Sequence, residues 1–412
     1  MSRLGTTNKK SLRHHFISPL RDFLNDSRST GVLLIGCTVI SIFISNSGSA
    51  SWYHQLWSGT IPGISTLRLP GSFLDWINNF LMAFFFVLAA TEIKRELLAG
   101  ELSSFKKAIL PFGAAFGGML VPALIFAAFN LRTAYSHGWG IPTATDIAFS
   151  LGAASLLGKR FPVGLKIFLM ALAIIDDLGA IIVIALFYGG KVQWLWLGLS
   201  ALIYAGLLLL NKLKIRFSIV HIITGGLLWF SMLQSGVEAS ITGVLFAFAM
   251  PVNALAIIEK AIHKYVNFMI LPLFALANTA IQIPSHVMSA LGTTVGLGVF
   301  FGLVIGKPLG IFLVSRIMVG LGIAQLPGNV RWKEVFGMGT LAGIGFTMSI
   351  FTTMLAFSDS ASRDIAKISI LVAVGASVLV SYIYFRSIGV RIIKPPILQP
   401  EQSKPDVQLN VS

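Results

Sequence analysis

Two adjacent carboxylates, Asp176 and Asp177, lie in the middle of an apolar stretch that runs from residue 169 to residue 187. Each aspartate near the centre of a membrane helix costs about +2.5 to +3.5 kcal/mol on insertion scales, so this pair has no ordinary structural reason to be there. Successive residues point about 100° apart around a helix, so the two side chains cannot face the same point. A carboxylate in a water-lined or protein-lined cavity can hold a proton or a small hard cation, but not both at once. The pair therefore predicts a site of competition between protons and cations.

A lysine that falls inside another apolar run, Lys307, is the first candidate partner for this pair. A buried ammonium requires a carboxylate, and the pair at residues 176 and 177 can supply one. The alternative is a lysine near a helix end whose amine reaches the membrane surface. Pro308 follows directly and breaks the local pattern of backbone hydrogen bonds.

Two apolar segments in distant parts of the chain are interrupted. Residues 140–157 contain Pro142, two threonines that include Thr145, and Asp146. Residues 335–356 contain Gly337, Gly339, Gly343 and Gly345 among hydroxyl side chains. A broken helix at membrane depth is tolerated only where it lines a cavity or is buried in protein, and a pair of them is typical of inverted-repeat transporters. The alternatives are an ordinary capping aspartate in a loop and glycines that serve close helix packing.

The composition is that of a polytopic membrane protein. Of 412 residues, 55% are hydrophobic and 11% are charged, where a soluble domain has about 25% charged residues. The mean hydropathy is +0.82. The single cysteine, Cys37, cannot form a disulfide within the chain. We predict an all-α protein of about twelve transmembrane helices, with inverted repeats and two broken helices. The apolar runs are 31–44, 73–93, 108–130, 140–157, 163–187, 192–210, 217–234, 237–256, 265–283, 290–315, 335–356 and 367–386.

The net charge of +15 would suggest a nucleic-acid partner in a soluble protein, but here it follows membrane topology. If the N-terminus is cytoplasmic, the segments on that side carry 25 of the 31 Lys and Arg residues, the opposite loops carry 5, and Lys307 is the remainder. This asymmetry predicts that both termini are cytoplasmic. It leaves no reason to expect a nucleic-acid partner.

The ends of the chain and the first loop complete the predicted organisation. We expect a cytoplasmic tail over 1–29, a transmembrane domain over 30–387 and a second cytoplasmic tail over 388–412. The first apolar run resembles a signal peptide, but its long basic leader favours an uncleaved first helix. Within the loop at 46–72, residues 64–69 form either a small β-hairpin or plain coil.

Charged residues gather where two predicted helices end on the cytoplasmic side. One group surrounds Glu92 and Glu96, and the other surrounds Glu259 and His263. They form either a solvated interfacial cluster or a funnel that concentrates cations and senses pH.

Six motifs follow one another along the chain. They are Glu92-Ile-Lys-Arg-Glu-Leu97, Thr145-Asp-Ile-Ala-Phe149, Ala173-Ile-Ile-Asp-Asp-Leu-Gly-Ala180, Leu271-Pro-Leu-Phe-Ala-Leu-Ala-Asn278, Gly306-Lys-Pro-Leu-Gly-Ile311 and Gly343-Ile-Gly-Phe-Thr-Met-Ser-Ile350. Taken together, they give the sequence a clear resemblance to the NhaA-type sodium/proton antiporters. The family is itself a standard example of inverted-repeat transporters.

The resemblance implies roles for the residues of the central site. Asp177 would be the central ligand for the ion and the proton, and Asp176 would pair with Lys307. Asp146 and Thr145 would lie where the two broken helices cross. Bound Na⁺ would be held by Asp177, Asp176 and Thr145.

The resemblance also implies the activity and its setting. We expect electrogenic exchange of one cytoplasmic Na⁺ or Li⁺ for about two external protons, serving sodium and pH homeostasis. The protein would be a lipid-embedded homodimer in the bacterial inner membrane, without a cofactor and without enzymatic activity. Its pH response would involve Glu92, Glu96, Glu259, His263 and Glu238.

Three positions depart from the usual family pattern. Asn79 stands where an aspartate is usual, and Glu238 and Lys260 each stand where a histidine is usual. These changes leave the central site intact but put the usual pH profile in question. Two other hypotheses use the same carboxylates: a passive cation channel and an intramembrane aspartyl protease. The protease is disfavoured because Asp177 lies in Ile-Ile-Asp-Asp and not in a Gly-x-Gly-Asp motif.

Overall fold

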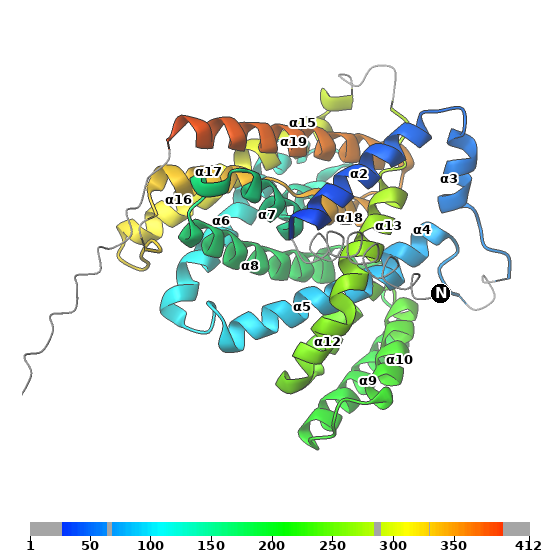
Figure 1. Ribbon diagram of the computed structural model, residues 1–412. Coiled ribbons are helices and arrows are strands. Elements are labelled where there is room, and N and C mark those ends of the chain that lie inside the picture. Colours follow the sequence, from blue (N-terminus) through cyan, green and yellow to red (C-terminus); the bar gives the residue numbers. More distant parts are fainter. Residues whose placement is uncertain (1–26, 64–67, 284–289, 329, 390–412) are drawn as a thin grey trace, which may run out of the picture.

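The computed structural model describes residues 27–63, 68–283, 290–328 and 330–389, and these residues form a bundle of helices (Figure 1). Within them there is no β-strand, and one isolated antiparallel bridge joins Thr60 and Ser72, on either side of the predicted hairpin at 64–69. The tip of that loop lies outside the described residues, as do most residues of the two predicted tails. The prediction of an all-α polytopic membrane protein is confirmed.

Six helices in the described part of the chain are long and apolar enough to cross a membrane. They are α4 and α5 together (Phe73–Ala99), α6 (Phe105–Asn130), α8 (Val163–Phe187), α9 (Trp194–Lys212), α15 and α16 together (Thr294–Gly320) and α19 (Ser360–Ser387).

Two pairs of helices pass the same length and hydropathy test but are bent at a short break. One pair is α2 (Ser27–Ser45) with α3 (Ala50–Ser58), and the other is α17 (Trp332–Ala342) with α18 (Phe346–Ala356), bent by 49°. The other helices of ten or more residues are α7 (Ile147–Leu156), α10 (Ile219–Ser235) and α12 (Val252–Tyr265). The shorter ones are α11 (Thr242–Ala249) and α13 (Leu271–Asn278).

The break predicted near residue 146 is also present. A 3₁₀ helix, Ser136–Thr143, is followed by extended backbone and then by α7, which begins after Asp146. The second break lies between α17 and α18, at Gly343–Gly345. The two breaks thus lie directly after Pro142 and among the glycines, where the sequence indicated that they would.

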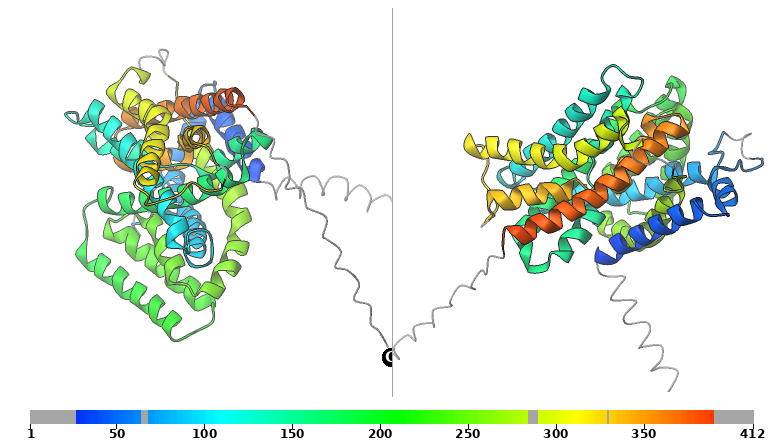
Figure 2. Two further views of the ribbon diagram at one scale, coloured as in Figure 1. Left: turned by 90° about the vertical axis from the view of Figure 1, so that its left-hand side faces the viewer. Right: turned by 90° about the horizontal axis from the view of Figure 1, so that it is seen from above.

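The helix that carries the aspartate pair, α8, lies in the interior of the bundle. Of the 18-residue apolar stretch of α8, 67% is buried inside the protein, whereas only 11% of the corresponding stretch of α9 is buried. In Figures 1 and 2 the α9–α10 hairpin stands at the edge of the bundle. A central α8 keeps both carboxylates away from lipid, and a peripheral α9 explains why its leucines are exposed.

Within the described residues, three helical segments contain a π-helical turn, a feature that the apolar pattern did not predict. The turns are Ile77–Leu81 between α4 and α5, Val266–Ile270 between α12 and α13, and Gly302–Gly306 between α15 and α16. Such turns are frequent at functional sites because the extra residue re-aims the side chains that follow. The third turn ends immediately before Lys307.

Close packing of α6 against α16 depends on two glycines. A Cβ atom at Gly310 would lie 2.0 Å from the carbonyl oxygen of Gly117, and one at Gly117 would lie 2.3 Å from that of Gly310. Here the small residues serve the approach of two backbones.

We predict that Gly310→Ala destabilises the protein by about 1–3 kcal/mol, because the added methyl group forces α6 and α16 apart. Thermal unfolding of the purified protein in detergent measures the effect. Gly198→Ala on α9 is the matched control, since no atom lies within 4 Å of its Cβ position. Equal melting temperatures for the two variants would show that this helix contact is not tight.

Candidate functional site

Asp146 joins the two broken spans at the point where they cross. Its backbone N–H donates to the carbonyl oxygen of Ile344 at 2.7 Å. Its Oδ1 atom accepts from the N–H of Phe149 at 2.9 Å, which caps α7. Its Oδ2 atom accepts from the N–H and the hydroxyl of Thr347 at 3.1 and 2.6 Å. One carboxylate therefore satisfies backbone donors in the first turns of both α7 and α18, which the positive end of a helix dipole favours.

Asp176 and Lys307 form an ion pair whose side chains are both fully buried. The Nζ atom of Lys307 also donates to the carbonyl oxygen of Thr143, at the first break, at 2.5 Å. The hydroxyl oxygen of Thr145 lies 2.6 Å from Oδ2 of Asp176 and 2.8 Å from the carbonyl oxygen of Ala342, at the second break. The ion pair is thus anchored to both broken spans.

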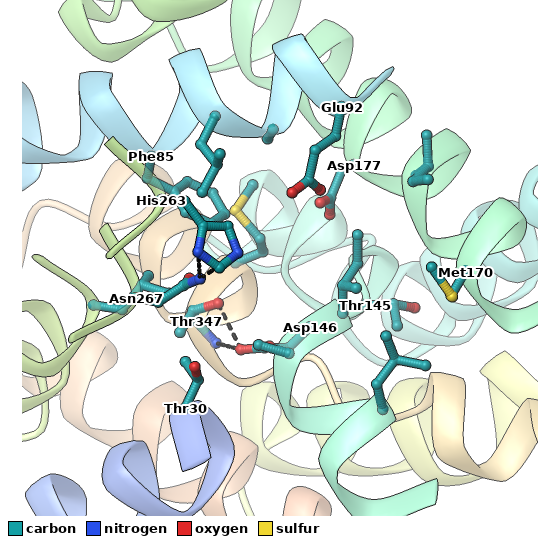
Figure 3. A pocket seen from close by; sticks show the side chains of 18 of the residues that line it. Thr30, Phe85, Glu92, Thr145, Asp146, Met170, Asp177, His263, Asn267 and Thr347 are labelled. Carbon is teal, nitrogen blue, oxygen red and sulfur yellow. Dashed lines mark hydrogen bonds between the residues drawn. The ribbon is translucent and has the colours of Figure 1, made fainter. Parts of the chain in front are cut away.

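Asp177 instead faces an open space. It lines a cavity of about 350 Å³ together with Thr145, Asp146, Thr347 and Glu92 (Figure 3). Its Oδ1 atom is buried and has no hydrogen-bond partner within the described residues. The acidic side chains of Asp176, Asp146 and Glu92 and the ammonium of Lys307 all act on it electrostatically. A carboxylate with a free oxygen and three negative neighbours is suited to take up a cation or a proton.

The structure therefore separates the members of the predicted sodium-ligand set. Thr145 and Asp177 line the cavity, whereas Asp176 and Lys307 do not. Oδ2 of Asp176 already has Lys307 and Thr145 as partners, whereas its Oδ1, like that of Asp177, is buried without a hydrogen-bond partner among the described residues. The described residues hold no group of three or more His, Cys, Asp or Glu side chains suited to a resident metal ion.

Charged and polar side chains from α5, α12 and the π-helical turn after α12 also line the cavity. They are Glu92, Arg95, Glu96, His263 and Lys264, and Asn267 lies 3.1 Å from a ring nitrogen of His263. Figure 3 shows His263 and Asn267 on the side of the cavity opposite Met170.

Two residues of the predicted pH-response group lie off the cavity wall. Glu259 does not line it but forms an ion pair with Arg95, with distances of 2.5 and 2.7 Å from its two oxygens to Nη1. Glu238 does not line the cavity either. It caps the short turn Ala239–Ile241 by accepting from the N–H of Ser240 at 3.4 Å.

Three features of the site were not assigned from the sequence. Thr347 donates to the same carboxylate of Asp146 that caps α7. A hydroxyl side chain within a glycine-rich break was the signal that could have indicated this contact. Lys94 donates to the carbonyl oxygens of Phe248 and Met250 at 2.8 and 2.6 Å, and so holds the C-terminal end of α11.

The third feature is a reciprocal amide pair. The Nδ2 atom of Asn278 donates to Oδ1 of Asn78 at 2.9 Å, and the reverse distance is 3.3 Å. Both side chains are buried, and each lies within or beside an apolar run. A polar asparagine within or beside an apolar run was the sequence signal that could have indicated such a pair.

Comparison with known proteins agrees with this geometry. The family model described as Na+/H+ antiporter 1 matches residues 21–385. The chain belongs to this family. It is 47% identical over 359 residues to the Na(+)/H(+) antiporter NhaA of Flavobacterium psychrophilum, which covers 86% of this chain and 92% of that protein. It is 44% identical over 376 residues to Na(+)/H(+) antiporter NhaA 1 of Clostridium beijerinckii, covering 89% and 94% of the two chains. These relatives are named as transporters and not as enzymes.

We predict that Lys307→Ala destabilises the protein by about 3–5 kcal/mol, because it leaves the buried carboxylate of Asp176 without a counter-ion. Thermal unfolding in detergent measures this loss. The double variant Lys307→Ala with Asp176→Asn regains part of the stability, because the unpaired charge is removed. An unchanged melting temperature in the single variant would mean that the amine of Lys307 reaches the membrane surface.

Proposed function

We propose that the chain is a secondary transporter that exchanges cytoplasmic Na⁺ or Li⁺ for external protons. The observation that carries the proposal is Asp177, a carboxylate with a free oxygen in a cavity where two broken helices cross. Membership of an Na+/H+ antiporter family supports the choice of ions. Carboxylate, hydroxyl and carbonyl oxygens suit a small hard cation.

In this proposal the ion and the proton compete for Asp177. Thr145 and Asp146 lie on the same cavity wall and provide further oxygens for Na⁺. When Lys307 releases Asp176, the freed carboxylate becomes a further ligand for Na⁺. The ammonium of Lys307 and the Na⁺ ion thus alternate as the counter-ion of Asp176. Movement of the broken spans would then expose the site to the other side of the membrane.

We further propose that about two protons move for each Na⁺, which makes the exchange electrogenic. The site holds three carboxylates, Asp146, Asp176 and Asp177, and the ammonium of Lys307, which is paired with Asp176, so it has more than one proton-binding group. A net positive charge then enters with the protons in each cycle. The membrane potential can thus drive Na⁺ out of the cell and serve sodium and pH homeostasis.

In this proposal, the charged side chains that line the cavity provide the pH response. Glu92, Glu96 and His263 line it, and Glu259 is linked to it through Arg95. Glu238 would act separately, from the turn that it caps.

For the setting we retain the sequence-based expectations as proposals. They are a tail–transmembrane domain–tail organisation with boundaries at 29/30 and 387/388, cytoplasmic termini, an inner-membrane location and a homodimer. A passive channel is not supported, since the relatives are named antiporters. The positive charge of Lys307 beside the acidic groups would also oppose free cation flow.

We predict that Asp177→Asn abolishes Na⁺/H⁺ exchange but leaves the fold intact, because the amide keeps the shape of the side chain and cannot exchange a proton for a cation. Collapse of a preformed proton gradient by Na⁺ in inside-out vesicles measures the activity over a range of pH. Asp359→Asn, at the exposed N-cap of α19, is the control that should remain active. Exchange retained by Asp177→Asn would overturn the assignment of the central residue.

We predict that Na⁺ efflux from proteoliposomes accelerates when a potassium diffusion potential makes the interior negative. The reason is that a cycle with two protons inward and one Na⁺ outward carries positive charge inward. Efflux is measured with and without the potential at the same pH on both sides. A rate that does not respond would indicate one-for-one exchange and would leave the ion specificity unaffected.

A further inference from the structure

A second cavity, of about 330 Å³, lies on the lipid-facing side of the helix crossing and plays no part in the proposed exchange. We refer to it as the α2–α19 groove. Its walls come from α2, α7, the first residue of α18, and α19, which stand together in Figure 1. Six of the residues that line it are Gly31, Val32, Gly152, Phe346, Leu371 and Gly375.

The lining of the groove excludes a polar ligand. Among its residues only Thr38 has a polar side chain, and the hydroxyl of Thr38 donates to the carbonyl oxygen of Leu34 at 2.8 Å. No lining residue of the groove has a buried polar atom without a partner. Water or an ion would therefore find nothing to bind there.

The mouth of the groove opens toward hydrocarbon. Val32, Ile35 and Val39 on α2 line it, and their exposed fractions are 58%, 45% and 61%. Residues 31–39 extend for about 12 Å along the helix at 1.5 Å per residue. An elongated apolar groove that faces a bilayer is filled by an acyl chain, since an empty space would forfeit dispersion contacts on one side.

Gly375 on α19 is not needed for close packing against another helix. No atom lies within 4 Å of the position that its Cβ would occupy. At Gly117 and Gly310, by contrast, a Cβ would collide with the facing backbone. The glycine on α19 therefore leaves room for an occupant and does not serve a close helix contact.

A positively charged residue follows one wall of the groove in the chain. Leu156, the last residue of α7, lines the groove, and Arg160 follows four residues later in a short 3₁₀ turn. Within the part of the chain that the structure describes, Arg160 has no carboxylate partner. A guanidinium at this place is suited to a lipid phosphate.

The floor of the groove connects it to the helix crossing. The rings of Phe149 and Phe346 lie 5.6 Å apart and both line the groove. The N–H of Phe149 is bonded to Asp146, and Phe346 directly precedes Thr347, which is bonded to the same carboxylate. An occupant would therefore pack against the residues that hold the two broken spans together.

We propose that the α2–α19 groove binds one acyl chain of an anionic phospholipid, with its phosphate at Arg160, and that this lipid stabilises the helix crossing. The site differs from the ion cavity in its residues and in its ligand. Its test does not depend on transport, so it can fail or succeed independently of the proposed exchange.

The test uses the full chain in liposomes that contain phosphatidylglycerol with a photoreactive group in one acyl chain. Labelling is expected on peptides of α2, α7 and α19. In Gly375→Leu, whose side chain fills the groove, this labelling falls roughly tenfold, which corresponds to ~1.4 kcal/mol of lost binding free energy. Gly226→Leu on α10 is the control, because that glycine is also exposed and has no atom within 4 Å of its Cβ position.

The headgroup is tested in the same experiment. Excess unlabelled phosphatidylglycerol should compete better than phosphatidylcholine, and Arg160→Gln should remove that difference. Added phosphatidylglycerol should raise the melting temperature of the unaltered chain and of Gly226→Leu but not that of Gly375→Leu.

Two results would overturn the proposal. Equal labelling of the unaltered chain and Gly375→Leu would mean that the probe reports ordinary surrounding lipid. Unlabelled groove peptides beside labelled α9 peptides would mean that a second copy or another part of this chain fills the groove.

Discussion

The structure depends on how backbone groups are satisfied where two helices stop inside the membrane. Hydrocarbon provides no water for a free N–H or carbonyl group, so each break must find its partners within the protein. Asp146 supplies them for the first turns of α7 and α18 at once. Thr145 and Lys307 reach the carbonyl groups of Ala342 and Thr143 on the other side of the breaks. Removing any of these groups leaves a buried polar atom unpaired, so the helix crossing and the proposed ion site depend on the same residues.

This constraint explains why adjacent aspartates on α8 have different surroundings. The 100° step between neighbours turns Asp176 toward Lys307 and the breaks, and turns Asp177 toward the cavity. The ion pair neutralises one of the two negative charges without closing the other to an ion. A helix that carried only one aspartate could not do both.

Much of this could be predicted from residue types, and the limits are instructive. The two breaks were indicated by Pro142 and by glycines 343 and 345, because these residues interrupt helices for local reasons. The pairing of Lys307 with an aspartate was predicted because a buried ammonium needs a counter-ion. The π-helical turns could not be predicted, since their backbone shift is set by packing against neighbouring helices. For the same reason the sequence grouped Glu238 with Glu92, although only Glu92 lines the cavity.

The amide pair of Asn78 and Asn278 shows how the same fold limits access to Asp177. Along α5 the cavity lining ends at Phe85, and along α13 it ends at Leu271. Each asparagine lies two helical turns beyond that point, on the side away from Glu92 and His263. Between them the buried rings of Phe86 and Phe274 both contact that of Phe351, on the same helix as Thr347. A path from Asp177 to this side would have to pass these rings, and Phe351 lies on α18, the helix that Asp146 holds at its first turn. In the proposed transporter, access and ion binding are thus linked through one short helix, because its first turn lines the cavity and its next turn carries a ring of this cluster.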